Sequence, residues 1–376
     1  MPSINMQKCF VRNEQLKHYP KVSIDSIPSR FKLMISSTSN FYGKCLFVIM
    51  MFSLDIFAVL DLLYISFDSI YSAQLQSFHA ILGHLPYLIF YFRYDHKLVK
   101  QIEEHWNALQ IDFDYETRKY FWTYKAFYRW LTYFMYIIAI IIIYFNQSSM
   151  QMEKDKIISS EVVFRENIKF YYACLIIGPL AFLNFFCNCC IQMDLPILAQ
   201  TAVQFNLIKL KKLLNESLKA EKSLNIDDIQ NIRHKYLLSC RLVDKINEIM
   251  SPCLVLAFTH FVANGCALAY TMLYTQPNQL TSWSPVIISS FFFTTSLILT
   301  RSALKINEKS LESLAIVYKL SLKTNSIRIL NEISLFLNHN EIGFTFGGMF
   351  MLTTSSLSTL YSAFITIVLA IPSFSR

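Results

Sequence analysis

The chain has 376 residues, of which 54% are hydrophobic and 16% are charged, and its formal net charge is +8. Soluble globular proteins carry about 25% charged residues, so the composition excludes a soluble globular protein, a disordered chain and a nucleic-acid-binding protein. An integral membrane protein is the class that remains.

Seven apolar stretches are long enough to cross the hydrocarbon core of a bilayer, which takes about 20 mostly apolar helical residues. They cover residues 45–67, 72–92, 130–145, 170–193, 252–274, 284–304 and 351–374. The sequence therefore predicts an all-α fold, a seven-transmembrane helix bundle. Asp55 and Asp61 lie in the first stretch, where an acid either has a direct function or hydrogen-bonds a neighbouring helix.

The positions of lysine and arginine predict the orientation of the bundle, because these residues concentrate on the cytoplasmic side. Of the 34, 29 lie in residues 1–44 and in the connections 93–129, 193–249 and 301–343, and five lie elsewhere. We therefore expect a cytoplasmic N-terminus and, after seven crossings, an extracellular C-terminus. This orientation is opposite to that of a G-protein-coupled receptor.

The expected cytoplasmic connections contain apolar residues spaced three and four apart, as on one face of a helix. These residues are Leu98, Ile102, Trp106 and Leu109; Val203, Leu207, Leu210 and Leu214; Ile229, Ile232, Tyr236, Val243, Ile246 and Met250; and Ile316, Leu320, Ile329, Ile333 and Leu337. A helix with one apolar face buries that face on something. The sequence predicts membrane helices that extend into the cytoplasm and pack together there, with amphipathic helices lying on lipid headgroups as the alternative.

The last apolar stretch carries hydroxyl side chains along one helical face. They are Thr354, Ser355, Ser358, Thr359, Ser362 and Thr366, at spacings of three and four. These hydroxyls could bond the backbone or a neighbouring helix as packing contacts. Alternatively, they face water and line an ion path in a symmetric assembly. The stripe by itself leaves both interpretations open.

The sequence lacks the residue patterns of common catalytic and metal sites. The eight histidines form no His-Glu-x-x-His or His-x-x-x-His pair, and no Gly-x-Ser-x-Gly or Walker lysine motif occurs. Cys187, Cys189 and Cys190 lie in an apolar stretch without a second cysteine pair at zinc spacing. We therefore expect no enzyme activity, no cofactor and no metal site.

The end of the chain combines a Phe-rich turn with two glycines, residues 344–352, and a last apolar stretch with Thr366 and Phe374 near its end. In these residues it resembles the end of insect gustatory receptors. In that family a Phe-rich, Gly-containing turn precedes a seventh span that closes on Thr-Tyr, five apolar residues and Gln-Phe. Residues 344–352 read FTFGGMFML, and Thr366 and Phe374 occupy the outer positions of the closing motif. Ile367 replaces the usual Tyr and Ser373 the usual Gln. Length and seven-span organisation extend this resemblance over the whole chain.

The resemblance implies a ligand-gated, non-selective cation channel in which four copies of the last helix surround the pore. Carried over position by position, the outer constriction of the pore falls on Ala370, Ser373 and Phe374. On the helical reading, the hydroxyl face continues the pore wall inward through Ser355, Ser358, Ser362 and Thr366. Phe374 and Ala370 would close the path by excluding water from it.

The resemblance also implies a ligand pocket in the outer half of the bundle, among spans two to six. At that depth the predicted helices place His79, Tyr136, Tyr171, Asn264, Tyr270, Trp283 and Thr294. Aromatic walls with a few polar groups suit a small organic ligand. The alternative is that the aromatic members belong to the ordinary belt of Tyr and Trp at membrane interfaces.

Four regions follow from these expectations. They are a cytoplasmic N-terminal segment (1–44), spans one to six with the ligand pocket and cytoplasmic helical extensions (45–300), cytoplasmic anchor helices (301–343) and a pore-lining seventh span (344–376). The expected partners are a small-molecule ligand, permeating cations, membrane lipid, and copies of itself or related receptors in a homotetramer or heterotetramer. The expected location is the plasma membrane of sensory neurons, as a multi-pass protein. A transporter and a G-protein-coupled-type receptor are the alternatives. A transporter would be marked by paired halves with broken helices, and a G-protein-coupled-type receptor by the reversed membrane topology.

Overall fold

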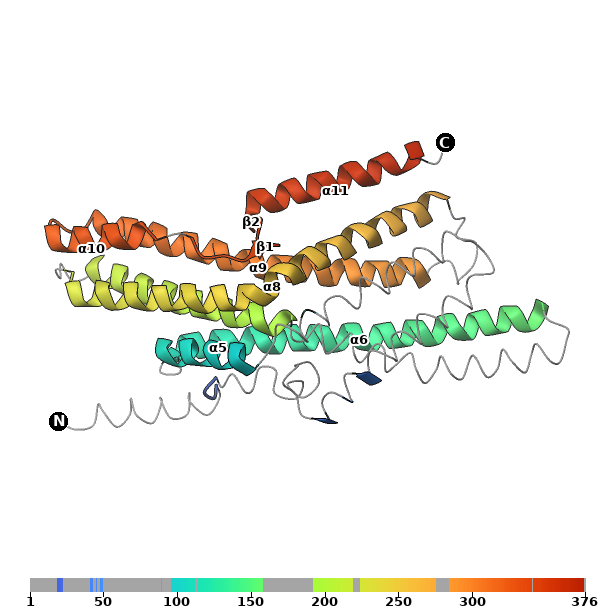
Figure 1. Cartoon of the computed structure of the whole chain (residues 1–376), viewed down its shortest axis with the longest axis horizontal. Helices are drawn as coiled ribbons and strands as arrows, with labels where there is room; N and C mark the ends of the chain where they lie inside the picture. Colours follow the sequence, from blue (N-terminus) through green and yellow to red (C-terminus); the bar gives the residue numbers. More distant parts are fainter. Residues whose placement is uncertain are drawn as a thin grey trace.

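The computed structural model describes residues 19–22, 41, 42, 45, 48, 49, 89, 96–111, 114–157, 192–218, 224–274, 284–339 and 341–374. Within them the chain is helical apart from short connections and one two-stranded sheet (Figure 1). The elements in chain order are α5 (His96–Leu109), α6 (Tyr115–Ile157), a helix over 192–218, α8 (Ile226–Tyr274), α9 (Ser284–Ser321), α10 (Ile327–Leu337), β1 (Thr345–Phe346), β2 (Phe350–Met351) and α11 (Thr354–Phe374).

Three helices are much longer than a bilayer is thick. α6, α8 and α9 have 43, 49 and 38 residues, and at about 1.5 Å per residue each exceeds a hydrocarbon core of about 30 Å. The third, fifth and sixth predicted spans lie within them, so these helices continue past the membrane. By length and apolar composition, Ile226–Ala263 qualifies as a membrane-crossing helix among the described residues, and Thr354–Ala370 is a shorter apolar helix.

The buried core lies where the extended ends of the helices meet α5 and α10. The predicted apolar faces are covered there: Trp106 and Leu109 of α5, Val203 in the helix over 192–218, and Val243 and Ile246 of α8 are at most 1% exposed. Ile316 and Leu320 of α9 and Ile329 and Ile333 of α10 join the same cluster. The prediction that these faces pack on one another is confirmed, and they are not left for lipid headgroups.

α6 has a different surface farther along its length. Its exposed large apolar side chains are Phe127, Trp130, Tyr133, Phe134, Ile137 and Ile141. Trp130 and Phe134 stack on each other with ring centroids 5.5 Å apart. A continuous apolar surface of this kind is costly in water. It begins beside the predicted third span, where hydrocarbon would cover it.

Polar side chains connect the helices within the core. Gln200 donates from Nε2 to the carbonyl oxygen and Oγ of Ser302, at 2.5 and 2.7 Å, and accepts from the Tyr120 hydroxyl at 3.1 Å. Asn206 donates to Ser239 Oγ at 2.7 Å. Buried polar groups require partners, so these bonds specify how α6, α8, α9 and the helix over 192–218 align.

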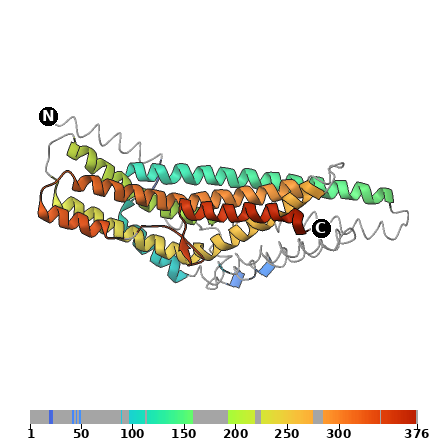
Figure 2. The same ribbon diagram turned by 90° about the horizontal axis from the view of Figure 1, so that it is seen from above.

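The last two helices, α10 and α11, are joined by the hairpin of β1 and β2. α10 packs on α8 and α9 within the core, whereas α11 extends from β1 and β2 in the direction away from α10, beside the C-terminal half of α8 (Figure 1). Viewed from above, the long helices and α11 follow the long axis of the molecule (Figure 2). The start of the predicted last span at residue 351 needs a correction, because Met351 pairs with Thr345 in the sheet and α11 begins at Thr354.

Candidate functional site

The hairpin between α10 and α11 turns on two glycines. Gly347 and Gly348 have φ angles of 61° and 76°, a left-handed conformation that glycine adopts without steric cost. Gly347 also donates its N–H to the carbonyl oxygen of Ser251 at 3.3 Å. A Cβ atom at position 347 would lie 2.8 Å from a methyl carbon of Val255. The turn is thus pressed directly against α8.

A set of hydrogen bonds fastens the hairpin to α8. Asn247 accepts from the backbone N–H of Thr345 and donates to its hydroxyl, both at 2.9 Å. The Thr345 hydroxyl in turn donates to Ser251 Oγ at 3.0 Å. These contacts lie within two turns of Pro252, which is inside α8. Because α11 follows the hairpin directly, its base is held by α8.

The first turn of α11 is capped by its own side chains. The N–H of Ser356 donates to Thr353 Oγ1 at 3.2 Å, and the N–H of Thr353 donates to Ser356 Oγ at 2.8 Å. This reciprocal arrangement satisfies two backbone donors, as in a capping box. The start of α11 is therefore well defined.

The hydroxyl side chains of α11 are exposed. Ser355, Ser358, Ser362 and Thr366 all lie on the open surface of the chain. The hydroxyl of Thr366 donates to the carbonyl oxygen of Ser362 at 2.9 Å. Ala370 is half-buried; Ser373 and Phe374 end the helix, and their side chains lie outside what the structure describes.

Aromatic side chains occupy the face of α11 that packs on its own subunit. Phe364 lies 4.7 Å from Phe261 of α8 between ring centroids, Tyr361 lies 5.4 Å from Phe261, and Phe261 stacks on Phe293 of α9 at 4.3 Å. Gly265 permits this approach, since a Cβ there would lie 2.3 Å from the Phe364 ring. Thr366 follows Phe364 by two residues, about 200° around the helix. The hydroxyl face thus points away from α8.

The predicted ligand-binding residues are only partly described. Tyr136 is half-buried on α6, Asn264 and Tyr270 lie on α8 with side chains outside the described set, and Thr294 is exposed on α9. The Thr294 hydroxyl donates to the carbonyl oxygen of Ser290 at 2.8 Å. His79, Tyr171 and Trp283 lie outside the described residues, as do Asp55 and Asp61.

Comparisons with known proteins identify the family. The profile described as 7tm chemosensory receptor matches residues 23–370. The chain belongs to the 7tm chemosensory receptor family. Members of this family are ligand-gated cation channels rather than enzymes. No match was found among curated proteins.

Solved structures show the fold of this chemosensory receptor. The olfactory receptor OR5 of the insect Machilis hrabei in complex with eugenol has a TM-score of 0.64 at 13% identity, over 93% of this chain and 97% of that one. The same receptor described without eugenol has a TM-score of 0.61 at 12% identity, over 98% of each chain. The predicted all-α, seven-transmembrane helix bundle is confirmed.

The aromatic cluster of this chemosensory receptor was missed in the sequence analysis. Its members Phe261, Phe293, Tyr361 and Phe364 come from three helices and are ordinary apolar residues in each. One signal was present: Tyr361, Phe364 and Val368 repeat at three and four residues opposite the hydroxyl stripe. That spacing marks a packing face, but it does not reveal the partner helix.

Proposed function

We propose that this chemosensory receptor is a gustatory receptor, a non-selective cation channel of four subunits opened by a small organic tastant, with α11 lining the pore. The observation that carries the proposal is the two-sided character of α11. Its aromatic face packs on α8, and its hydroxyl face is uncovered in the single chain. Six hydroxyls on a helix face that meets no other described helix are accounted for when four copies enclose a wet axis.

An exposed apolar surface at the other end of the molecule supports contacts between subunits. The exposed large apolar residues of α9, α10 and the turn between them are Leu311, Tyr318, Leu322, Ile327, Leu330 and Leu335. Such a surface belongs against another protein chain when it lies outside the membrane. We assign these anchor helices to contacts between subunits, either identical copies or related receptors.

Ligand control would act through the contacts of α11. The predicted pocket positions Asn264 and Thr294 lie on α8 and α9, the two helices that supply Phe261 and Phe293 to the aromatic cluster. A ligand that fits better when α11 has moved away from the pore axis shifts the equilibrium toward the open channel. In the closed channel, Phe374 and Ala370 exclude water from the outer end of the pore.

A cysteine-accessibility experiment tests the pore assignment. The chain is expressed alone in a non-native cell, and cation current is recorded during a compound screen and after a thiol-reactive cation is applied. We expect Ser358→Cys and Ser362→Cys to be modified with a change in current. The matched control is Val368→Cys on the face toward α8, with the nine native cysteines measured in the parent chain. If Ser362→Cys is modified without any change in current, the hydroxyl face does not line the pore.

A second measurement addresses the gate. We expect Phe374→Ser to raise basal current, because a smaller polar side chain rehydrates the constriction. Phe127→Ser on the exposed surface of α6 is the control for loss of an aromatic residue. If basal current is unchanged at equal surface expression, the assignment of Phe374 to the gate is wrong. The assignment of the hydroxyl face to the pore wall would still stand.

Epitope tags test the orientation and location. We propose a cytoplasmic N-terminus and an extracellular C-terminus in the plasma membrane of sensory neurons, on the basis of the lysine and arginine distribution. A C-terminal tag should be stained in intact cells and an N-terminal tag only after permeabilisation. The reverse staining pattern would favour a G-protein-coupled-type receptor.

A further inference from the structure

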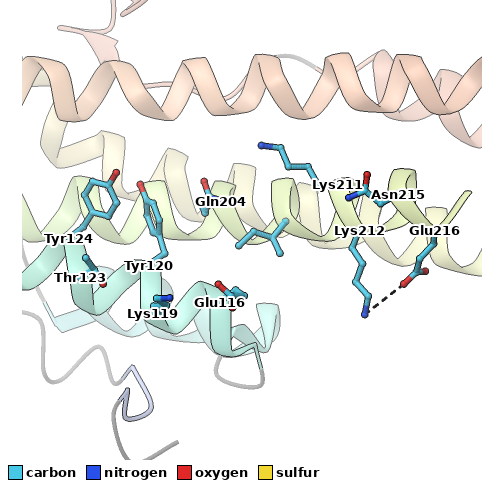
Figure 3. A pocket seen from close by; sticks show the side chains of 11 residues that line it. Glu116, Lys119, Tyr120, Thr123, Tyr124, Gln204, Lys211, Lys212, Asn215 and Glu216 are labelled. Atoms are coloured by element: carbon cyan, nitrogen blue, oxygen red, sulfur yellow. Dashed lines mark ion pairs between the residues drawn. The ribbon is translucent and has the colours of Figure 1, made fainter. Parts of the chain in front are cut away.

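A groove lies between α6 and the helix over 192–218, at the end of the molecule that holds the buried core. Its volume is about 840 Å³. α6 lines one side and the helix over 192–218 the other, as Figure 3 shows. The lining residues are Glu116, Lys119, Tyr120, Thr123, Tyr124, Gln204, Ile208, Lys211, Lys212, Asn215 and Glu216.

Cations from α9 extend this lining over the tyrosines. Lys309 Nζ donates to the Tyr120 hydroxyl and lies 3.8 Å from the centre of that ring. Lys305, one turn earlier, lies 5.1 Å from the centre of the Tyr124 ring. Cations over aromatic faces are stabilised by the ring electrons, but a ring carries no net negative charge.

The carboxylates around the groove do not balance its lysines. Lys211 pairs with Glu312 at 2.6 Å and Lys212 with Glu216 at 3.8 Å. Within the described part of the chain, Lys119 and Lys309 have no carboxylate partner. Burial lowers the pKa of Lys309 to about 7; Lys305 and Lys211 lower it further, and Glu312 opposes them. A phosphate anion beside this amine would raise its pKa again and favour the charged form. Among the described residues that line the groove or contact its lining, five lysines face three carboxylates, so basic groups outnumber acidic ones there. The lysines are Lys119, Lys211, Lys212, Lys305 and Lys309, and the carboxylates are Glu116, Glu216 and Glu312.

We infer that this groove binds a phosphate monoester anion, either the headgroup of a phosphoinositide lipid or a soluble inositol phosphate. Lysines bind phosphate as mobile point charges, and Thr123, Gln204 and Asn215 add neutral hydrogen-bonding groups at the wall. Tyr120 precedes the predicted third span by ten residues, about 15 Å of helix. Basic pockets at this depth on the cytoplasmic side bind lipid headgroups. The inference does not require the channel function.

Binding is measured on the full chain in phosphatidylcholine nanodiscs, using a fluorescent phosphatidylinositol bisphosphate and, separately, soluble inositol trisphosphate. We expect Lys211→Gln with Lys309→Gln to weaken binding about tenfold or more, since two charge-assisted contacts are lost. Lys319→Gln with Lys323→Gln is the control, because it removes the same charge from exposed positions at the end of α9 that do not line the groove. Its affinity should stay within about twofold of the parent.

The two probes distinguish the sources of the ligand. Binding of the lipid without competition by inositol trisphosphate assigns a headgroup embedded in the membrane, and competition assigns a site open to soluble anions. Both results support the inference. No binding of either probe, or an equal loss in groove and control variants, overturns it.

A second variant guards against misfolding of the double substitution. Asn215 is exposed at the wall of the groove, so Asn215→Glu adds a negative charge without disturbing the core. We expect this variant to keep the elution profile of the parent and to bind the probe at least about fivefold more weakly. Parent-like affinity in Asn215→Glu would contradict the site.

Discussion

Asp194 illustrates how one side chain joins two helices, the helix over 192–218 and α6. It is 3% exposed and forms an ion pair with Arg129 of α6. Burial raises its pKa to about 6, although Arg129 and Lys125 oppose the rise. Its ion pair with Arg129 favours the charged form, so the carboxylate balances the cations of α6.

The first prediction concerns this ion pair. Asp194→Asn removes the buried carboxylate that Arg129 and Lys125 face, and breaking a buried pair costs about 3 kcal/mol. We expect a clear drop in the apparent melting temperature of the detergent-solubilised protein. Glu308→Gln, an exposed substitution of the same type, is the control. Equal melting temperatures for both variants would show that Asp194 is not needed for stability.

A second prediction at this scale concerns pH and Lys309. Tyr120, Lys305, Lys211 and Glu312 face or surround this amine, whose pKa is about 7 against an ordinary 10.5. Between these values the unfolded chain binds more protons than the folded one, so stability contributed by this group rises with pH. In Lys309→Met, the gain in melting temperature over the parent should be largest at or below neutral pH and shrink toward alkaline pH. A constant difference across that range contradicts the buried charge.

At the scale of elements, the hairpin and α11 form one unit braced on α8. The two glycines of the turn offer a matched pair, because both have positive φ angles but only Gly347 abuts α8. α8 contacts this unit at two places, at the hairpin and, through Gly265, at Phe364 of α11. In the proposed gating, α11 would move relative to α8 between these two contacts.

The third prediction compares the two glycines. Alanine at either position incurs about 1 kcal/mol of backbone strain. Gly347→Ala should be further destabilising by about 1–3 kcal/mol, since its Cβ lies 2.8 Å from Val255, whereas position 348 has no atom within 4 Å. Thermal unfolding of the two variants measures the difference. Equal losses would mean that the hairpin does not press on α8.

The fourth prediction tests coupling between α8 and α11. Gly265→Ala places a methyl group 2.3 Å from the Phe364 ring, so the ring or α11 must shift. We expect altered basal current or ligand sensitivity. Phe364→Ala in the same chain restores the space, and a double-mutant cycle should show strong non-additivity. Additive effects on gating would argue that the two helices move independently.

At the scale of the whole molecule, apolar surface is distributed between two settings. On α6 it begins beside a predicted span, where lipid would cover it. On α9 and α10 it lies at the same end of the molecule as the charged connections, and exposed apolar surface of this kind is typical of contacts with another protein chain. This second apolar surface is the one that the proposed subunit contacts would cover.

The fifth prediction follows from that surface. Tyr318 and Leu322 are 58% and 69% exposed, and Tyr318→Ser with Leu322→Ser should shift the purified protein from the proposed tetramer to smaller species. Light scattering of the detergent-solubilised protein measures the shift. Phe127→Ser, from the exposed surface of α6, should leave the oligomer intact. If the double variant remains fully tetrameric, Tyr318 and Leu322 do not lie in the contact between subunits.

Periodic patterns were the part of the fold that could be read in advance. Leu98 to Leu109 predicted a helix face, and α5 covers His96–Leu109 with Trp106 and Leu109 buried. The predicted hydroxyl face of α11 is likewise exposed as one stripe. The polar ties from Gln200 and Asn247 could not be foreseen, because an isolated amide in a helix carries no information about its partner.

Composition and periodicity alone determined that this chain is a membrane helix bundle, since hydrophobic length and helical spacing are local properties of consecutive residues. The tertiary structure decided which faces meet. It brought Phe261, Phe293 and Phe364 together, and it packed Gly347 against α8. It also lined one groove with lysines from two helices and placed Lys309 of a third helix over the ring of Tyr120. These contacts join residues far apart in the chain, and their energies depend on distances and burial that arise only when the helices pack.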